Sequence, residues 1–396
     1  MTSIKDVVAI SGVRTPIGRF GGTLKDVPSY ELGGVAIGEA LRRAGVKGDE
    51  IDEVIMGNCR QAGNGPNPCR SAALLAGIPV NVPASTLNMA CPSGMKAIMN
   101  GALAIAGNTA QMVVAGGMDS MSTIPHIVRG LRFTPKKMGD IVIEDGWKDA
   151  TDPIAQTTMG QTAERLAQKH GISRAAQDLF ALGSHQKAIA AQANGLFTNE
   201  LAPISLSPGF SHGPVTLDLD ETPRANTTIE KLNALPPAFS RQGSVTAGNS
   251  STMSDGACAL VLTSVQAAKD QGRSPLFRIV EFSQCAVDGE VMGEGPSVSI
   301  AAVLQKAKMS LKDMDLIEIN EAFASQVVTN IQQLTLDEQK LNIHGGAIAL
   351  GHPTGISGAR IVITLAHALQ AMDKQLGLAA ICGAGGVTTA MIIERI

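Results

Sequence analysis

The chain has 396 residues, of which 44% are hydrophobic and 17% charged, and its formal net charge is −3 at pH 7. A chain of this length and composition is expected to fold into more than one core, which argues against a disordered protein. The small net charge, without a block of basic residues, argues against nucleic acid as a partner, and no stretch approaches 18 uninterrupted apolar residues, so no membrane span is expected.

The opening segment, MTSIKDVVAISGVRTP, carries Asp6 and only a short apolar stretch, so it does not resemble a secretory signal and a cytoplasmic location is expected. Six cysteines in a chain of this size are too sparse for a disulfide scaffold, which favours reduced thiols. No two of them have C-x-x-C spacing, and no histidines have the spacing of an HExxH motif, so no metal site is expected.

In chain order, the first half predicts a helix end, a turn and a buried strand over residues 48–58, GDEIDEVIMGN. Next, the segment Cys91-Pro92-Ser93-Gly94 opens an apolar, alanine-rich helix, because proline is favoured in a first helical turn. A buried strand, MVVAGG, follows over residues 112–117.

The same features recur in the second half, which indicates an internal repeat. Asp52 corresponds to Asp315 in LKDMDLIEINE, and Cys91 corresponds to His352 in HPTG. The strand of residues 112–117 corresponds to LAAICGAGG, residues 378–386, and this alignment places Ala115 opposite Cys382. Two related α/β halves with mixed sheets are therefore predicted.

Residues between the repeats have no counterpart and are rich in proline and glycine, which predicts an inserted cap over a site. The N-terminal half is expected to cover residues 1–118 and to return at 247–274. An inserted loop domain would occupy 119–246, covering coenzyme A and substrate and making oligomer contacts. The C-terminal half would occupy 275–396.

Cys91 is predicted to lie at the cap of its helix, where free N–H groups and the helix dipole would lower the pKa of its thiol. If the halves pack about a pseudo-twofold axis, Cys91 and His352 come together as an activated nucleophile pair. The simpler alternative is that His352 only caps a helix and Asn320 only forms a turn. The cysteines at 59, 69, 258 and 285 are interpreted as small buried hydrophobic residues.

Several segments resemble the thiolase family, in the family's order and approximate spacing: NMACPSGMKAI, NEAFA, GGAIALGHPTGISGAR and CGAGG. VRTPIGRFGG near the start and LPPAFSRQGSVTAGNSSTMSDGA at 235–257 extend the resemblance over essentially the whole chain. The resemblance implies an α/β thiolase fold of five layers, αβαβα, with the inserted loop domain.

It also implies roles for individual residues. Cys91 would be the acylated nucleophile, His352 would take its proton, and Cys382 would be a second, acid/base cysteine. Asn320 would position a water that forms one oxyanion hole with His352, while the backbone N–H groups of Cys91 and Ala384 would form another. No cofactor is implied, since coenzyme A thioesters are the substrates.

For the substrate, Met159 and Phe323 match pocket-lining positions of the family, although either is also interpretable as core. Ser251 matches a contact to the pantetheine of coenzyme A, and Arg224 resembles a contact to the nucleotide phosphates, with a solvated arginine as the alternative. A basic loop that could attract coenzyme A or contact another subunit contains Arg129, Arg132, Lys136 and Lys137.

Two departures from the family pattern bear on substrate and geometry. Ala384 replaces the first glycine of the more usual C-x-GGG run, which would crowd the pocket only if the backbone needed positive φ there. Thr158 stands where short-chain members commonly carry a histidine, so chain-length preference is left open.

The resemblance implies reversible Claisen condensation and thiolysis by a homo-oligomer, a homotetramer or a homodimer. Acetyl-CoA acetyltransferase is the first choice, because the insert resembles that of short-chain biosynthetic members. A 3-ketoacyl-CoA thiolase of broader chain length is the alternative. Cys382 argues against a decarboxylating ketoacyl synthase, and the full set of nucleophiles argues against a non-catalytic acyl-CoA binding protein.

Overall fold

Strands from both halves of the chain form one ten-stranded mixed sheet in the computed structural model, which describes residues 4–133, 138–206 and 214–396. The main path of this sheet runs β12-β13-β14-β11-β1-β10-β5-β3-β4. Two residue pairs, Val8 with Arg278 and Ala9 with Phe277, join the halves where β1 meets β11. The predicted mixed sheets of the two halves are thus continuous through one short antiparallel pairing.

The first half contributes β1 (Val7–Arg14), β2 (Gly18–Arg19), β3 (Glu53–Gly57), β4 (Ala84–Leu87), β5 (Met112–Ser120) and β10 (Ser254–Ser264). Strand β3 lies parallel to β4 and β5, and β10 is antiparallel to β5 and β1. The continuous apolar run of β5 is buried on both faces, because Val113 packs toward the centre of the molecule and Val114 toward the outer helices.

The second half contributes β11 (Phe277–Ala286), β12 (Leu316–Ile319), β13 (Leu376–Cys382) and β14 (Val387–Glu394). Strands β12 and β13 are parallel, and β14 is antiparallel to β13 and β11. This order repeats that of the first half, with β12, β13 and β14 in the places of β3, β5 and β10.

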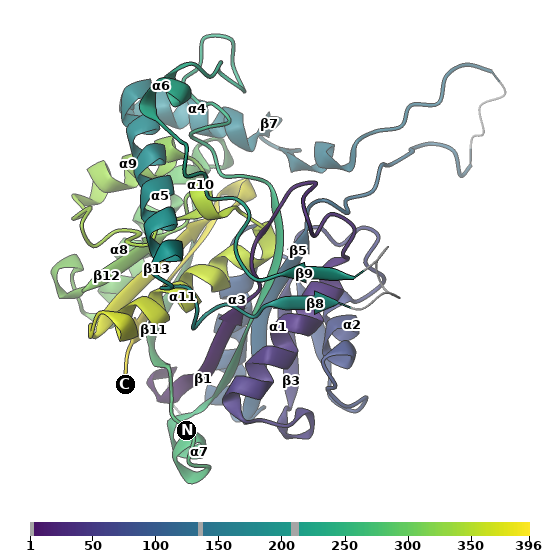
Figure 1. Ribbon diagram of the computed structural model, residues 1–396, viewed down its shortest axis with the longest axis vertical. Coiled ribbons are helices and arrows are strands. Elements are labelled where there is room, and N and C mark those ends of the chain that lie inside the picture. Colours follow the sequence, from purple (N-terminus) through teal and green to yellow (C-terminus); the bar gives the residue numbers. More distant parts are fainter. Residues whose placement is uncertain (1–3, 134–137, 207–213) are drawn as a thin grey trace.

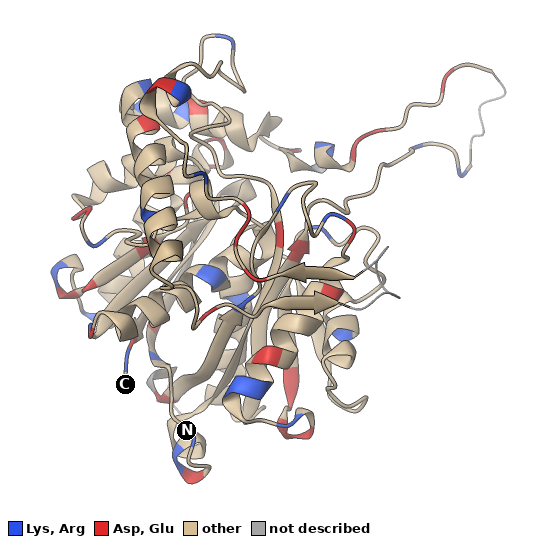
Figure 2. Cartoon of the chain, in the orientation of Figure 1, with Lys and Arg blue, Asp and Glu red and all other residues tan. Residues whose placement is uncertain are grey.

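Helices complete the predicted five layers (Figure 1). The central layer contains α3 (Ser93–Ala106) and α11 (Thr354–Ala371), which pack between the two halves of the sheet. Helix α3 carries one basic residue, Lys96, and α11 carries one, Arg360. Neither helix has an acidic residue (Figure 2). The outer layers contain α1 (Ser29–Ala44) and α2 (Pro68–Leu75) on one side, and α8 (Gly295–Ala307) and α9 (Ala324–Leu334) on the other.

Matching carboxylates confirm the repeat but correct its register. Asp52 accepts hydrogen bonds from the backbone N–H groups of Gln111 and Met112, and Asp315 accepts from those of Gln375 and Leu376. Met112 therefore corresponds to Leu376, which makes Met118 the counterpart of Cys382. The predicted pairing of Ala115 with Cys382 is wrong by three residues, because the similar small-residue strings at the strand ends are not at equivalent positions.

Between β5 and β10 the chain leaves the sheet as an extended arm and then packs over both halves (Figure 1). This part contains β6 (Thr151–Asp152), β7 (Thr157–Thr158), α4 (Met159–His170), α5 (Arg174–Ala193), β8 (Ile204–Leu206), β9 (Val215–Leu217) and α6 (Ile229–Asn233). Helices α4 and α5 contact α9, and α5 also contacts α10 (Ala347–Leu350). A helix α7 (Val265–Asp270) connects β10 to the second half.

Short 3₁₀ turns occur at η1 (Ile4–Asp6), η2 (Gly48–Glu50), η3 (Gly146–Ala150), η4 (Gly289–Glu294), η5 (Leu311–Asp313) and η6 (Ala384–Gly386). Of the predicted basic loop, Arg132 is exposed and Arg129 lies 3.4 Å from Glu144, whereas Lys136 and Lys137 lie outside the described residues. Among the described residues, no helix has both the length and the apolar character needed to cross a membrane.

Candidate active site

Cys91 lies in a tight turn that leads into α3. Ala90 has a φ of +53°, and the Ser93 hydroxyl holds the turn by accepting from the Met89 N–H at 2.8 Å and donating to the Ala90 carbonyl at 2.5 Å. The helix begins at Ser93 with Pro92 as its N-cap. Cys91 is therefore one residue farther from the helix than predicted, because Pro92 takes the cap position rather than the first helical position.

The starts of α3 and α11 meet because glycines allow their backbones to touch. A Cβ atom on Gly94 would lie 2.9 Å from the Ala359 nitrogen, and one on Gly358 would lie 2.7 Å from the Met95 nitrogen. No side chain fits such separations. Since Cys91 and His352 each directly precede the proline that caps one of these helices, the crossing brings both residues to one region of the molecule.

His352 is buried and oriented by hydrogen bonds. Its Nδ1 lies 2.6 Å from the Ser357 hydroxyl, which itself donates to the Pro353 carbonyl at 3.0 Å. Because that hydroxyl proton is already used, Nδ1 is the donor to Ser357 and Nε2 is left as the basic nitrogen. Burial lowers the pKa of His352 to about 3, with a smaller contribution from the positive charge of Arg360, so the imidazole is neutral.

The Cys91 thiol does not have the lowered pKa that its place near a helix start predicts. Burial raises its pKa to about 11. The positive charge of Arg60 and the backbone N–H groups of Ala384 and of Cys91 itself act in the opposite direction, but burial outweighs them. The resting pair is thus a neutral thiol and a neutral imidazole, and ionisation of Cys91 depends on a base.

Cys382 ends β13 with 1% of its surface exposed. Burial, together with a smaller Coulombic contribution from a Cys91 thiolate, raises the pKa of its thiol to about 12. The two thiols therefore lie within electrostatic range of one another. Beyond Cys382, Gly385 and Gly386 adopt positive φ, whereas Ala384 does not, so the alanine that departs from the family pattern fits its backbone without strain.

Asn320 directly follows β12 and is fully buried. Neither its amide oxygen nor its amide nitrogen has a hydrogen-bond partner among the described residues. A buried amide without partners is costly unless another molecule satisfies it. Its environment therefore suits binding of a water or a substrate oxygen better than the alternative role of a turn residue.

Met159 and Phe323 pack in one apolar cluster with Cys382. The rings of Phe323 and Phe239 meet edge to face, with centroids 6.1 Å apart. Other members of this cluster are Ala163, Val245, Met292 and Ala322. The cluster provides an apolar wall beside the second thiol.

Ser251 precedes Thr252, a residue that contacts the segment of His352 and lines a cavity together with Arg224. The Ser251 N–H donates to the Ala322 carbonyl at 3.0 Å, and the next residue, Thr252, accepts at 2.9 Å from the His352 N–H. Thr252 and Arg224 both line a cavity of about 180 Å³. Arg224 is exposed, so this cavity extends from the surface toward the segment that holds His352.

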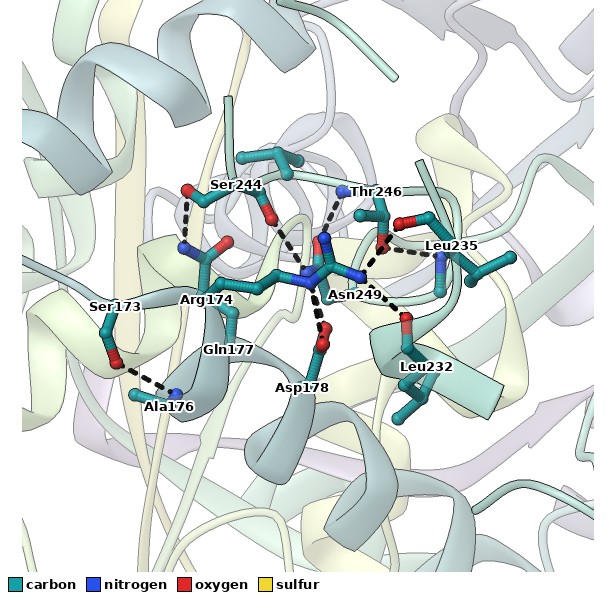
Figure 3. Close-up of polar contacts among 12 residues, drawn as sticks. Ser173, Arg174, Ala176, Gln177, Asp178, Leu232, Leu235, Ser244, Thr246 and Asn249 are labelled. Atoms are coloured by element: carbon teal, nitrogen blue, oxygen red, sulfur yellow. Dashed lines mark hydrogen bonds and ion pairs between the residues drawn. The ribbon is translucent and has the colours of Figure 1, made fainter. Parts of the chain in front are cut away.

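Helix α5 fixes the segment that leads to Ser251 (Figure 3). Asp178 lies between two partners, with Arg174 Nε at 2.6 Å and Asn249 Nδ2 at 2.9 Å. Asn249 also accepts from the Thr246 N–H at 2.7 Å. These bonds hold the polypeptide just before Ser251 against the helix.

Asp119 is a residue of the site that the motif search did not identify. One of its oxygens accepts from the Asn58 amide and from the N–H groups of Cys59 and Arg60, and the other accepts from Thr354 and the N–H of Gly355. This buried carboxylate thus fastens the first half to the start of α11. An acidic residue at the end of an apolar strand was the signal available in the sequence.

Ser357 and Arg60 were also missed, because a serine inside a helix and an arginine in a loop are common in structural roles. No cluster of three or more His, Cys, Asp or Glu side chains suited to a metal ion occurs in residues 4–133, 138–206 and 214–396.

The sequence matches two family models, "Thiolase, N-terminal domain" over residues 7–266 and "Thiolase, C-terminal domain" over residues 273–395. An acetyl-CoA acetyltransferase of Cupriavidus necator is 45% identical over 394 residues, which cover 98% of this chain and 99% of that protein. One from Escherichia coli K12 is 44% identical over 398 residues, with 99% and 100% covered.

Two solved structures are similar to this chain over its whole length. The Bacillus anthracis acetyl-CoA acetyltransferase matches with a TM-score of 0.97 at 42% identity, with all of both chains covered. Human mitochondrial 3-ketoacyl-CoA thiolase in complex with CoA matches with a TM-score of 0.95 at 41% identity, with 100% of this chain and 99% of that chain covered.

Proposed function

Because the chain belongs to the thiolase family of acyltransferases, we propose that it catalyses reversible condensation and thiolysis of acyl-CoA thioesters, with acetyl-CoA acetyltransferase as its main activity. The observation that carries this proposal is the pair of buried thiols, Cys91 and Cys382, within electrostatic range of one another. Hydrolysis would need only one nucleophile, whereas carbon–carbon bond formation needs a nucleophile and a separate base.

In the first half-reaction, Nε2 of His352 takes the Cys91 proton, and the thiolate attacks the thioester carbonyl of acetyl-CoA. The N–H groups of Cys91 and Ala384 would stabilise the oxyanion, a role supported by their effect on the Cys91 thiol, whose pKa both lower. The departing coenzyme A thiolate takes the proton of Cys382. An acetyl-Cys91 thioester and a Cys382 thiolate result.

In the second half-reaction, Cys382 removes an α-proton from another acetyl-CoA. A thiolate whose conjugate acid has a pKa of about 12 is a strong enough base to contribute to this step. The enolate oxygen is stabilised by protonated His352 and by the water that Asn320 binds. Its α-carbon attacks the acetyl-Cys91 carbonyl, Cys91 leaves as a thiolate, and His352 returns the proton.

Coenzyme A would enter by Arg224 and Ser251, and Met159 and Phe323 would line the acyl pocket. No cofactor takes part in these steps. The alternative is a 3-ketoacyl-CoA thiolase of broader chain length, which the likeness to the human enzyme and the Thr158 departure support.

Homo-oligomeric assembly and a cytoplasmic location belong to the same proposal. The arm carries large apolar side chains that are strongly exposed, including Phe133 and Met138, each at 90%. Contiguous exposed apolar residues mark interaction sites. We infer that the inserted domain of residues 119–246 contacts another subunit through this arm as well as covering the site.

Thiolysis of acetoacetyl-CoA and of 3-oxooctanoyl-CoA, measured side by side, tests the activity and its chain length. Cys91→Ser serves as the matched control and should be inactive in both directions, because a hydroxyl has no thiolate character at neutral pH. Absence of cleavage of either substrate by the unmodified protein would reject the assignment, and so would full activity of Cys91→Ser.

A further inference from the structure

A second cavity, of about 310 Å³, lies beside the turn that carries Cys91. Its lining includes Cys59 and Asn88, which connect it to that turn. The Cys59 thiol donates to the Ala90 carbonyl at 3.0 Å, and the Asn88 amide donates to the Cys59 carbonyl at 3.4 Å. A group attached to Cys91 therefore has this cavity as a neighbour.

Among the described residues that line the cavity, Arg60 is the only charged one. Its guanidinium lies 5.0 Å from the ring centroid of Trp147. The Nε of Arg60 and the Nε1 of Trp147 are both buried without a hydrogen-bond partner in the described part of the chain. Arg60 thus lines the cavity with a cationic group that contacts the Trp147 ring and has no hydrogen bond from Nε to a described residue.

No described carboxylate lies at ion-pair distance from this guanidinium. Asp119 is within electrostatic range, but its carboxylate already accepts five hydrogen bonds. The charge of Arg60 also reaches the Cys91 sulfur, because it lowers the pKa of that thiol. The cation and the atom that is acylated therefore lie within electrostatic range of one another.

We propose that Arg60 binds a carboxylate at the far end of the acyl group on Cys91, so that among substrates longer than acetoacetyl-CoA the protein prefers 3-oxoacyl-CoA thioesters that carry a second carboxyl group. The inference rests on the proposed thiolase reaction. A carboxylate would pair with the planar guanidinium in a charge-assisted geometry, whereas an alkyl end would leave a partly desolvated cation unpaired.

Cleavage of such a substrate would use Cys91 and Cys382 in the same roles as in the proposed thiolase reaction. Cys91 attacks the 3-oxo carbon, the bond between the α-carbon and that carbonyl breaks, and acetyl-CoA leaves after protonation of its α-carbon by Cys382. The acyl group that remains on Cys91 ends in a carboxylate. Coenzyme A thiol then attacks the Cys91 thioester, which releases a dicarboxylic acyl-CoA and restores the Cys91 thiol.

Two substrates of equal chain length isolate the effect of the carboxylate. 3-Oxoadipyl-CoA ends in a carboxylate, and 3-oxohexanoyl-CoA ends in a methyl group. Thiolysis of each, with acetoacetyl-CoA as a reference, should give a higher kcat/KM for 3-oxoadipyl-CoA. A protein that cleaves acetoacetyl-CoA but shows no preference for the carboxylate rejects this inference alone. Failure with all three substrates rejects the thiolase reaction as well.

Variants of Arg60 test whether this residue recognises the carboxylate. Arg60→Gln should lower the ratio of the two kcat/KM values by about 10- to 100-fold, as expected for loss of a hydrogen bond between charged groups, and Arg60→Lys should lower it less. Any general effect of Arg60 on Cys91 cancels in the ratio. Arg241→Gln removes one positive charge from an exposed arginine and should leave the ratio unchanged. An unchanged ratio in Arg60→Gln overturns the proposal.

Trp147 is the single tryptophan of the chain and contacts Arg60, so its fluorescence reports on the environment of that guanidinium. Titration of the Cys91→Ala variant with succinyl-CoA should change this fluorescence saturably, with a larger amplitude than butyryl-CoA produces, and the added Arg60→Gln change should remove the difference. Mass photometry of Arg60→Gln tests whether Arg60 instead contacts another subunit. Loss of the oligomer together with an unchanged substrate ratio would assign Arg60 to a subunit contact and reject its role in substrate binding.

Discussion

The Nδ1 of His352 lies 2.6 Å from the hydroxyl of Ser357, which lies in the first turn of α11. This contact fixes which imidazole nitrogen is basic, although Ser357 itself need not touch substrate. Ser357 is thus a positioning residue, and its effect should appear in catalysis rather than in binding.

Ser357→Ala should lower kcat for acetoacetyl-CoA thiolysis by about tenfold with little change in KM, because the neutral base loses its fixed tautomer and orientation. Ser357→Thr keeps the hydroxyl and should recover part of the loss. Steady-state kinetics measure both variants. Equal losses in Ser357→Ala and Ser357→Thr would indicate a packing role instead.

Acid should destabilise the protein through His352. Its pKa is lowered from 6.5 to about 3 in the folded state, so the unfolded state binds the extra proton between these values, and stability falls as pH decreases from about 6.5 toward 3. The contribution is on the order of a few kcal/mol. Urea unfolding of His352→Gln across this pH range should show a shallower decline than the unmodified chain, and an identical decline would exclude His352 as a source.

Cys382→Ala should still be acylated but should not condense two acetyl groups. Cys91 and His352 remain to form the acetyl-enzyme, whereas the base for the α-proton is lost, which typically costs about 10²- to 10⁴-fold. Intact-mass spectrometry after addition of acetyl-CoA should show one acetyl group, mapped to Cys91. An acetyl group on Cys382 in the unmodified protein would contradict this division of roles.

Thr158 has a structural role that bears on chain-length tests. It forms a capping box with Gln161 at the start of α4, beside the Met159 pocket position. Thr158→His should favour acetoacetyl-CoA over longer substrates and should also cost about 1 kcal/mol of cap stability. Thr158→Asn keeps a capping side chain and separates the two effects. An unchanged ratio of kcat/KM values in Thr158→His would show that this position does not set chain length.

The crossing of the central helices gives a sharp stability test. Gly358→Ala would place a Cβ atom 2.7 Å from the Met95 backbone nitrogen, and such overpacking should cost about 1 to 3 kcal/mol or more. Gly38→Ala in α1 is the matched control, because no atom lies within 4 Å of its Cβ position, and it should stabilise slightly. Similar unfolding free energies for both variants would contradict the close helix contact.

Much of the fold was predictable because the repeat, the apolar strands and the proline-led helices depend on local pattern. The register of Cys382 was not, since it depends on hydrogen bonds that Asp315 accepts from backbone N–H groups at a strand start about 60 residues away. The Cys91 pKa was predicted in the wrong direction, because the motif shows nearby N–H groups but not how deeply the thiol is buried. The roles of Asp119 and Arg60 were not predictable for the same reason, because they depend on contacts with residues distant in the sequence, such as Thr354 and Trp147.

Strand β10 has a consequence for how the chain is synthesised. It lies between β1 and β5, yet it leaves the ribosome more than a hundred residues after β5 ends. At translation rates of about 5 to 20 residues per second, this interval lasts roughly 7 to 27 seconds. During that time the nascent first half exposes two long apolar strand edges that only β10 can join, so chaperone binding at this stage should determine the yield of folded enzyme.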